Sequence, residues 1–156
     1  NITVTALNGG IASSSTLVAG WTSGTIDNTS DKHLDKLVSA KFTLESSGLA
    51  AGEIRVYGYA MLDDSTWPDI FSSGTEGTEG TATVLDAEQM SGLVLLWGTT
   101  TDTGASEAHN MPPISLRSAF GYMPAKCAIF VTQNSGAALE TSGNQVTVKG
   151  VYESVA

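Results

Sequence analysis

One stretch of the chain, residues 53–62, most narrows the folds that the sequence can adopt. Its side chains alternate with a period of two, which is the repeat of an extended strand. One face carries slim aliphatic side chains that suit a packed sheet interface. The other face carries Arg55, Tyr57 and Tyr59, whose polar ends stay wet while their apolar parts cover a surface. The stretch predicts a β-strand with both faces occupied, the second face by a partner or by a neighbouring loop.

The composition indicates an all-β chain with one domain. The 156 residues are 41% hydrophobic and only 15% charged, and Gly, Ser and Thr are abundant. Such a mixture favours strands and turns over surface helices, which usually carry many Glu and Lys residues. A chain of this length can bury most of the surface of its extended form in one core. We therefore expect a single domain over residues 1–156, in which residues 1–16 can form an extended arm.

Further strand patterns recur along the chain, separated by turn signals. Residues 38–45, 127–132 and 145–155 alternate, and residues 93–97 are apolar on both faces, as in a strand in the middle of a sandwich. About eight strands at this short spacing predict an antiparallel β-sandwich of jelly-roll type. Residues 99–110 read as a long polar loop.

Helix is expected only as single turns. One turn is predicted near Ala87, and a second at Leu116–Phe120, where Ser115 can cap the first turn and Gly121 can end the last. The Gly, Thr and Glu repeat of residues 74–81 reads as a mobile surface loop.

Charge and cysteine content exclude several classes of protein. The net charge is −9, and the seven Lys and Arg residues do not cluster, which argues against a nucleic-acid partner. The single cysteine, Cys127, cannot form an internal disulfide, so the fold fits a reducing cytoplasm. The longest apolar run is far shorter than the roughly 20 residues that span a bilayer, so we expect a soluble protein without a membrane partner.

No residues have the spacing of a catalytic or metal site. Asp63 and Asp64 are adjacent on the chain and would point to opposite sides of a strand, so a turn is the favoured role over a calcium loop shared with Asp69. His33 and His109 lack the spacing of a zinc site. Cys127 alternates with apolar residues and is expected to be buried. The sequence predicts no catalytic residue, no cofactor and no metal.

The informative excess is aromatic. Trp67 and Phe71 lie in a loop beside Pro68, where burial in the same subunit and burial against another subunit are equally compatible with the sequence. Aromatic residues and Arg are the usual anchors of protein interfaces, although aromatics also form the stacking platforms of carbohydrate-binding modules. The candidate interface residues are Trp67, Phe71, Tyr57, Tyr59 and Arg55.

Six segments, taken in order, resemble small structural proteins of tailed bacteriophages. They are residues 21–30, 34–41, the loop Thr66-Trp67-Pro68-Asp69-Ile70-Phe71, the turn Phe120-Gly121-Tyr122-Met123-Pro124, and residues 130–136 and 148–152. The nearest likeness is to the jelly-roll decoration, or cement, subunits of capsids, and it runs over most of the chain.

This resemblance implies a virion protein without enzymatic activity. Such a subunit is made in the host cytoplasm, sits on the capsid surface, binds the major capsid protein and forms a homo-oligomer, with a trimer favoured. A symmetric oligomer can turn modest single contacts into durable attachment. The alternatives are a carbohydrate-binding module and a phage tail or fibre component.

Overall fold

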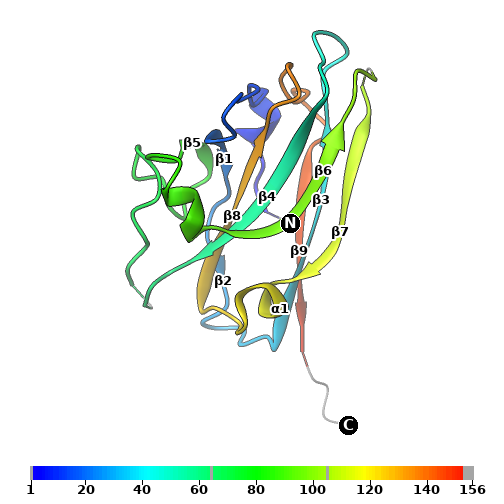
Figure 1. Cartoon of the computed structure of the whole chain (residues 1–156). Helices are drawn as coiled ribbons and strands as arrows, with labels where there is room; N and C mark the ends of the chain where they lie inside the picture. The colour runs from blue at the N-terminus through cyan, green and yellow to red at the C-terminus, as the bar shows by residue number, and fades with distance from the viewer. Residues whose placement is uncertain (1, 64, 105, 153–156) are drawn as a thin grey trace.

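The strand that the alternation predicted is present as β4, Gly52–Ala60, in the computed structural model, which describes residues 2–63, 65–104 and 106–152 (Figure 1). Ile54 and Val56 are fully buried on one face of β4. On its two edges β4 pairs antiparallel with β6, Val94–Thr101, and with β8, Lys126–Gln133. Both faces of β4 are occupied, as its sequence indicated.

The strands form two antiparallel sheets that pack face to face, which confirms the predicted sandwich. The larger sheet has the order β5-β1-β8-β4-β6, and the two-residue strand β2 also pairs with β8. The smaller sheet has the order β7-β3-β9 (Figure 1). The remaining strands are β1 Ala19–Thr22, β2 Ile26–Asp27, β3 Asp35–Thr43, β5 Gly80–Thr83, β7 Ala108–Ser115 and β9 Gln145–Val151.

The main core lies between the two sheets. On β3, Val38, Ala40 and Phe42 point inward and are buried, while the residues between them are at least partly exposed. They pack with the inward face of the larger sheet, which includes Trp21 at 0% exposure. The period-two pattern of β3 therefore sets which face of the smaller sheet is inside.

A second core lies on the outer face of the larger sheet. Tyr59 and Phe130 from this face join Ile70 and Phe71 from the segment between β4 and β5 in one buried cluster. The excursion between β4 and β6, residues 61–93, folds back over the sheet and includes β5 and a 3₁₀ turn at Gln89–Gly92. This excursion makes the second face of β4 an interior face.

The helical content is as small as expected. The helix α1, Leu116–Phe120, is capped by Ser115 Oγ, which accepts a hydrogen bond from Ser118 N–H at 2.9 Å. The left-handed Gly121, with φ of 79°, ends it. The turn predicted near Ala87 instead begins at Gln89. No helix among the described residues is long and apolar enough to cross a membrane.

The edge strands correct two expectations. Part of the polar stretch read as a loop over residues 99–110 belongs to strands, because β6 runs to Thr101 and β7 begins at Ala108. Pro112 and Pro113 are tolerated in β7 because it is an edge strand, and they fall where the pairing with β3 shifts register. Likewise β6, expected in the middle of the sandwich, is an edge strand of the larger sheet.

The beginning of the chain is more firmly packed than a free arm. Residues 2–4 belong to no helix or strand, and a turn at residues 5–6 leads into a 3₁₀ turn at Leu7–Gly9. Leu7 is 0% exposed and Ile11 is 4% exposed, and both belong to the main core.

Two leucine truncations test this division between core and surface. Leu44→Ala, in the main core, should lower the free energy of unfolding by about 2–5 kcal/mol, because it removes buried methyl groups and leaves a cavity. Leu95→Ala, on the exposed side of β6, should change it by about 0.5 kcal/mol or less. Urea denaturation followed by tryptophan fluorescence measures both. Equal losses for the two variants would contradict the packing described.

Candidate functional site

The aromatic residues predicted to face a neighbouring subunit are mostly covered by their own chain. Tyr59 and Phe71 are each 1% exposed, and Tyr57 is 6% exposed. The rings of Tyr59 and Phe71 meet edge to face, with centroids 5.4 Å apart, and Phe71 also contacts the ring of Phe130. The face with Tyr57 and Tyr59 is therefore not exposed, because the excursion between β4 and β6 buries it.

Trp67 and Arg55 remain partly exposed, and their contact with another subunit stays a prediction. The Trp67 ring lies 5.4 Å from that of Tyr59 and directly over Gly77, where an added Cβ would come within 2.4 Å of it. The Gly77 N–H donates to Tyr59 Oη at 3.0 Å. Arg55 is occupied by Glu53, with a shortest ion-pair distance of 2.7 Å.

Two glutamates anchor the Gly, Thr and Glu repeat that was expected to be mobile. Glu76 Oε1 accepts hydrogen bonds from the backbone N–H groups of Ile70 and Phe71, at 3.0 and 2.7 Å. Glu79 Oε1 accepts from Ala6 N–H at 2.6 Å and from the indole N–H of Trp21 at 2.8 Å. The repeat thereby ties the covering excursion and the beginning of the chain to the sheets.

Of the three acidic residues considered for a metal site, Asp63 forms a turn. Asp63 Oδ1 accepts from the N–H groups of Ser65 and Thr66, each at 2.7 Å, and these bonds lower the Asp63 pKa to about 2. Asp64 lies outside the described residues, and Asp69 is exposed. Among residues 2–63, 65–104 and 106–152, no three His, Cys, Asp or Glu side chains are grouped as metal ligands.

Cys127 is buried as predicted. Its side chain is in the main core at 0% exposure, and burial raises the pKa of its thiol to about 12. A thiol in this environment is a poor nucleophile, because the thiolate is the reactive form.

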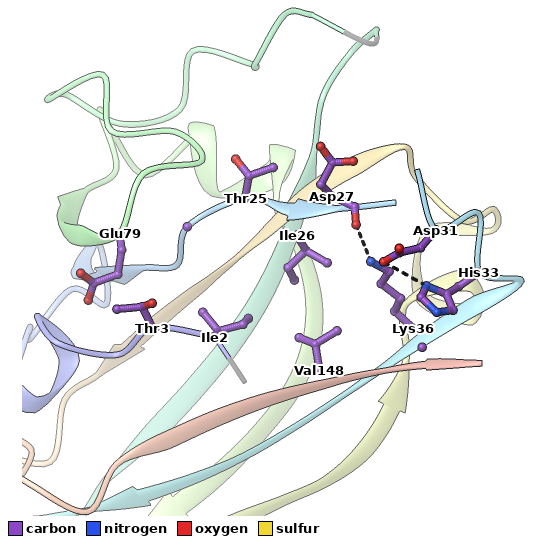
Figure 2. A pocket seen from close by; sticks show the side chains of 12 residues that line it. Ile2, Thr3, Thr25, Ile26, Asp27, Asp31, His33, Lys36, Glu79 and Val148 are labelled. Carbon is purple, nitrogen blue, oxygen red and sulfur yellow. Dashed lines mark hydrogen bonds and ion pairs between the residues drawn. The ribbon is translucent and has the colours of Figure 1, made fainter. Parts of the chain in front are cut away.

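A cleft of about 620 Å³ opens at one edge of the sandwich (Figure 2). It lies between β9, the edge strand of the smaller sheet, and the β2 side of the larger sheet. Ile2, Ile26 and Val148 form its apolar floor. The polar residues around it are Thr3, Thr25, Asp27, Asp31, His33, Lys36 and Glu79.

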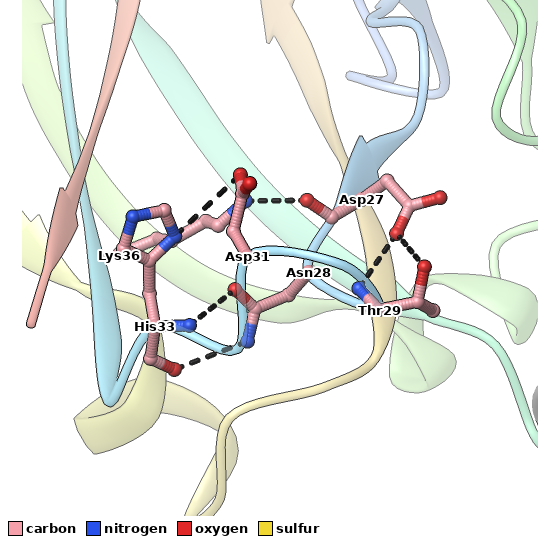
Figure 3. A network of polar contacts seen from close by, with 6 residues as sticks. All are labelled: Asp27, Asn28, Thr29, Asp31, His33 and Lys36. Carbon is pink, nitrogen blue, oxygen red and sulfur yellow. Dashed lines mark hydrogen bonds and ion pairs between the residues drawn. The ribbon is translucent and has the colours of Figure 1, made fainter.

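Lys36 is the unusual residue of the cleft. It continues the inward register of Val38 and Ala40, so its side chain enters between the sheets and is only 6% exposed. Its ammonium group donates a hydrogen bond to the backbone carbonyl of Asp27 (Figure 3). A buried ammonium group can donate three hydrogen bonds, and this is the one found among the described residues.

The loop after β2 is fixed by local hydrogen bonds. The Asn28 side chain bridges both backbone groups of His33, donating to its carbonyl at 3.1 Å and accepting from its N–H at 3.0 Å (Figure 3). Thr29 donates two hydrogen bonds to Asp27 Oδ1, which lower the Asp27 pKa. These hydrogen bonds hold the loop in place as one wall of the cleft.

His33 lies at one end of the cleft (Figure 2). Its ring lies over Gly150, where an added Cβ would be 2.3 Å from the ring. Its Nδ1 is 3.7 Å from Asp31 Oδ2, and it has no hydrogen-bond partner among the described residues. Only glycine at position 150 leaves room for this arrangement.

One edge of β9 opens into the cleft. Ile2 N–H donates to the Val146 carbonyl at 3.2 Å, so the backbone groups of Val146 point away from β3. Because these groups alternate in an antiparallel strand, those of Val148 and Gly150 point the same way. No described residue pairs with them.

The cleft offers surfaces for contact with another molecule. Its apolar floor, buried ammonium and open strand edge suit an extended polypeptide segment, which needs backbone pairing and alternate side-chain contacts. Sequence reasoning missed Lys36, although residue 36 shares the parity of the buried positions on β3 and could have been found by it. No signal in the sequence points to the free edge of β9, because strand order depends on contacts between distant residues.

No protein-family model, curated protein or solved structure matches this chain.

A glycine pair tests how Trp67 is seated. Gly77 and Gly74 both have positive φ, at +71° and +59°, but a Cβ meets the Trp67 ring at Gly77 and open space at Gly74. Gly74→Ala should cost about 1 kcal/mol of unfolding free energy from backbone strain alone. Gly77→Ala should cost about 1–3 kcal/mol more, because the ring must move. Urea denaturation measures both, and equal costs would show that Trp67 does not pack on Gly77.

Thiol labelling tests the burial of Cys127. In the native protein at pH 8 the thiol should react far more slowly with a colorimetric disulfide reagent than it does in guanidinium chloride, where labelling should be complete. The unfolded thiol ionises near pH 9 and the native thiol near pH 12, so ionisation favours the unfolded state and stability should fall as pH rises through this window. Rapid stoichiometric labelling of the native protein would refute the buried site.

Proposed function

We propose that this chain is a non-enzymatic structural subunit of a bacteriophage virion that decorates the capsid surface. In this role it binds the major capsid protein and other copies of itself, and it stabilises the shell through many repeated contacts. The proposal combines the resemblance to cement subunits with a site that provides binding surfaces.

The observation that carries the proposal is a convergence at the cleft. Three of the six segments that resemble cement subunits are far apart in the chain, at residues 21–30, 34–41 and 148–152. They supply the wall formed by β2 and its loop, the buried Lys36, and the free edge of β9. Half of the segments that resemble cement subunits therefore meet at one cleft.

The carbohydrate-binding alternative has less support. It requires Trp67, Tyr57 and Tyr59 to form an exposed platform for stacking on sugar rings. Both tyrosines are buried beneath the excursion between β4 and β6. The hydroxyl groups of Tyr59 and Thr22 also share a hydrogen bond, with their oxygens 2.6 Å apart. A tail or fibre component stays open as the alternative virion location.

Immunogold labelling of virions is the test. Particles purified from a lysate that expresses this chain are labelled with an antibody to it and imaged by negative stain. We expect gold distributed uniformly over the heads, because a decoration subunit occupies many symmetry-related positions. Gold confined to tails or fibres would assign the chain to that alternative, and unlabelled particles would overturn the proposal. Omitting the primary antibody gives the background.

A further inference from the structure

Residues 2–6, called here the leading segment, have a strand pattern in their sequence and no strand partner among the described residues; in the single subunit residues 5 and 6 form a turn, and the Val4 carbonyl accepts from Asn8 N–H at 2.9 Å. Ile2 and Val4 are partly buried against the main core, while Thr3 and Thr5 are exposed. Only one of its backbone hydrogen bonds to a described residue reaches a strand, the bond from Ile2 N–H to Val146. The chain thus holds a β-competent segment next to an unpaired strand edge.

Within one subunit this segment cannot use the rest of the edge. Leu7 is buried in the core, and Ala6 N–H is held by Glu79, so the segment is fixed at its far end. When the segment stays in its own subunit, Ile2 therefore lies opposite Val146. Val148 and Gly150 lie two and four residues further along β9, about 7 and 14 Å away at the rise of a strand.

We propose that the leading segment of a second copy of this chain occupies the cleft and adds a strand to the free edge of β9. The pairing is antiparallel, with Ile2 of one copy opposite Gly150 of the other and Val4 opposite Val148. Compared with the observed bond between Ile2 and Val146, this register shifts the segment by four residues along β9. Because four is an even number, the same side chains of the segment still face the core. Each copy gives its segment to a neighbour, which leaves its own edge free to receive one.

The chemistry of the cleft favours this occupant over a charged peptide. The leading segment carries no charged side chain, whereas the cleft already holds both Lys36 and the carboxylates of Asp27 and Asp31. In the proposed register Ile2 and Val4 face the apolar floor of Ile26 and Val148. Thr3 and Thr5 stay on the solvent side, where Thr3 is opposite the exposed Lys149.

The edge itself is suited to receiving a strand. On the other side of the smaller sheet, β7 carries Pro112 and Pro113, which cannot donate to an added strand. β9 has no proline, and its free N–H groups open onto a cleft that leaves room for another chain. The inference rests on one part of the proposed function, namely that copies of this chain associate with one another.

A matched pair at Val148 tests the strand addition. Val148→Pro removes the outward N–H without touching a bond to β3, and Val148→Ala removes side-chain atoms while keeping that N–H. By analytical ultracentrifugation the wild type should associate, and Val148→Ala should associate more weakly than the wild type because it trims the apolar floor. Val148→Pro should associate at least about tenfold more weakly than Val148→Ala, which corresponds to roughly 1.4 kcal/mol. A monomeric wild type, or equal association of the two variants, would overturn the proposal.

A cysteine pair tests the register and does not depend on Val148→Pro folding. One preparation carries Thr3→Cys and another Lys149→Cys, and the native Cys127 is buried and does not interfere. Opposed residues of an antiparallel pair are close enough for a disulfide. Mixing and oxidation should link the two preparations.

The control replaces Lys149→Cys with Lys41→Cys, which is exposed on β3 and lies away from the cleft edge. It should link to Thr3→Cys at background level. Equal linking of both lysine positions, or none, would refute the register. Neither readout involves virions, so their failure is distinguishable from a failure of head labelling.

Discussion

The rest of the structure depends on the burial of β8 on both faces. Seven of its eight residues are buried, which removes them from water on each side of the larger sheet. A strand with apolar side chains on both faces needs a layer of structure on each side, because an uncovered face would expose apolar surface to water. The smaller sheet covers one face, and the excursion between β4 and β6 covers the other with Ile70 and Phe71.

This constraint decides where contacts with other molecules can form. Tyr57, Tyr59, Phe71 and Phe130 complete the second core, and Glu76 and Glu79 hold the covering segments by accepting hydrogen bonds from backbone N–H groups. The smaller sheet has the order β7-β3-β9, so β9 is one of its two edge strands and has one side without a strand partner in the part of the chain that the structure describes. Among the described residues, the backbone groups of Val148 and Gly150 that face the cleft are unpaired, and the ammonium group of Lys36 makes one of the three hydrogen bonds open to it.

The sequence predicted what depends on local patterns. The strand at β4, the inward face of β3, the caps of α1 and the burial of Cys127 all follow from periodicity or from capping chemistry. It failed where distant segments decide the outcome. Tyr57 and Tyr59 were candidate interface residues, because the alternation of one strand shows that its second face is occupied but not whether a loop of the same chain or a partner covers it. The first residues of β7, 108–110, were read as part of a polar loop, because the pairing of an edge strand depends on contacts that are not local.

The central claim is that the outer face of the larger sheet is covered within one subunit. Amide hydrogen exchange of Phe71, whose N–H donates to Glu76 inside the second core, tests it most directly. At dilutions where ultracentrifugation shows only monomer, we predict that the Phe71 amide stays as protected as it is at high concentration. Protection that disappears on dilution, in step with dissociation of an oligomer, would show that another subunit supplies the cover and would contradict the account.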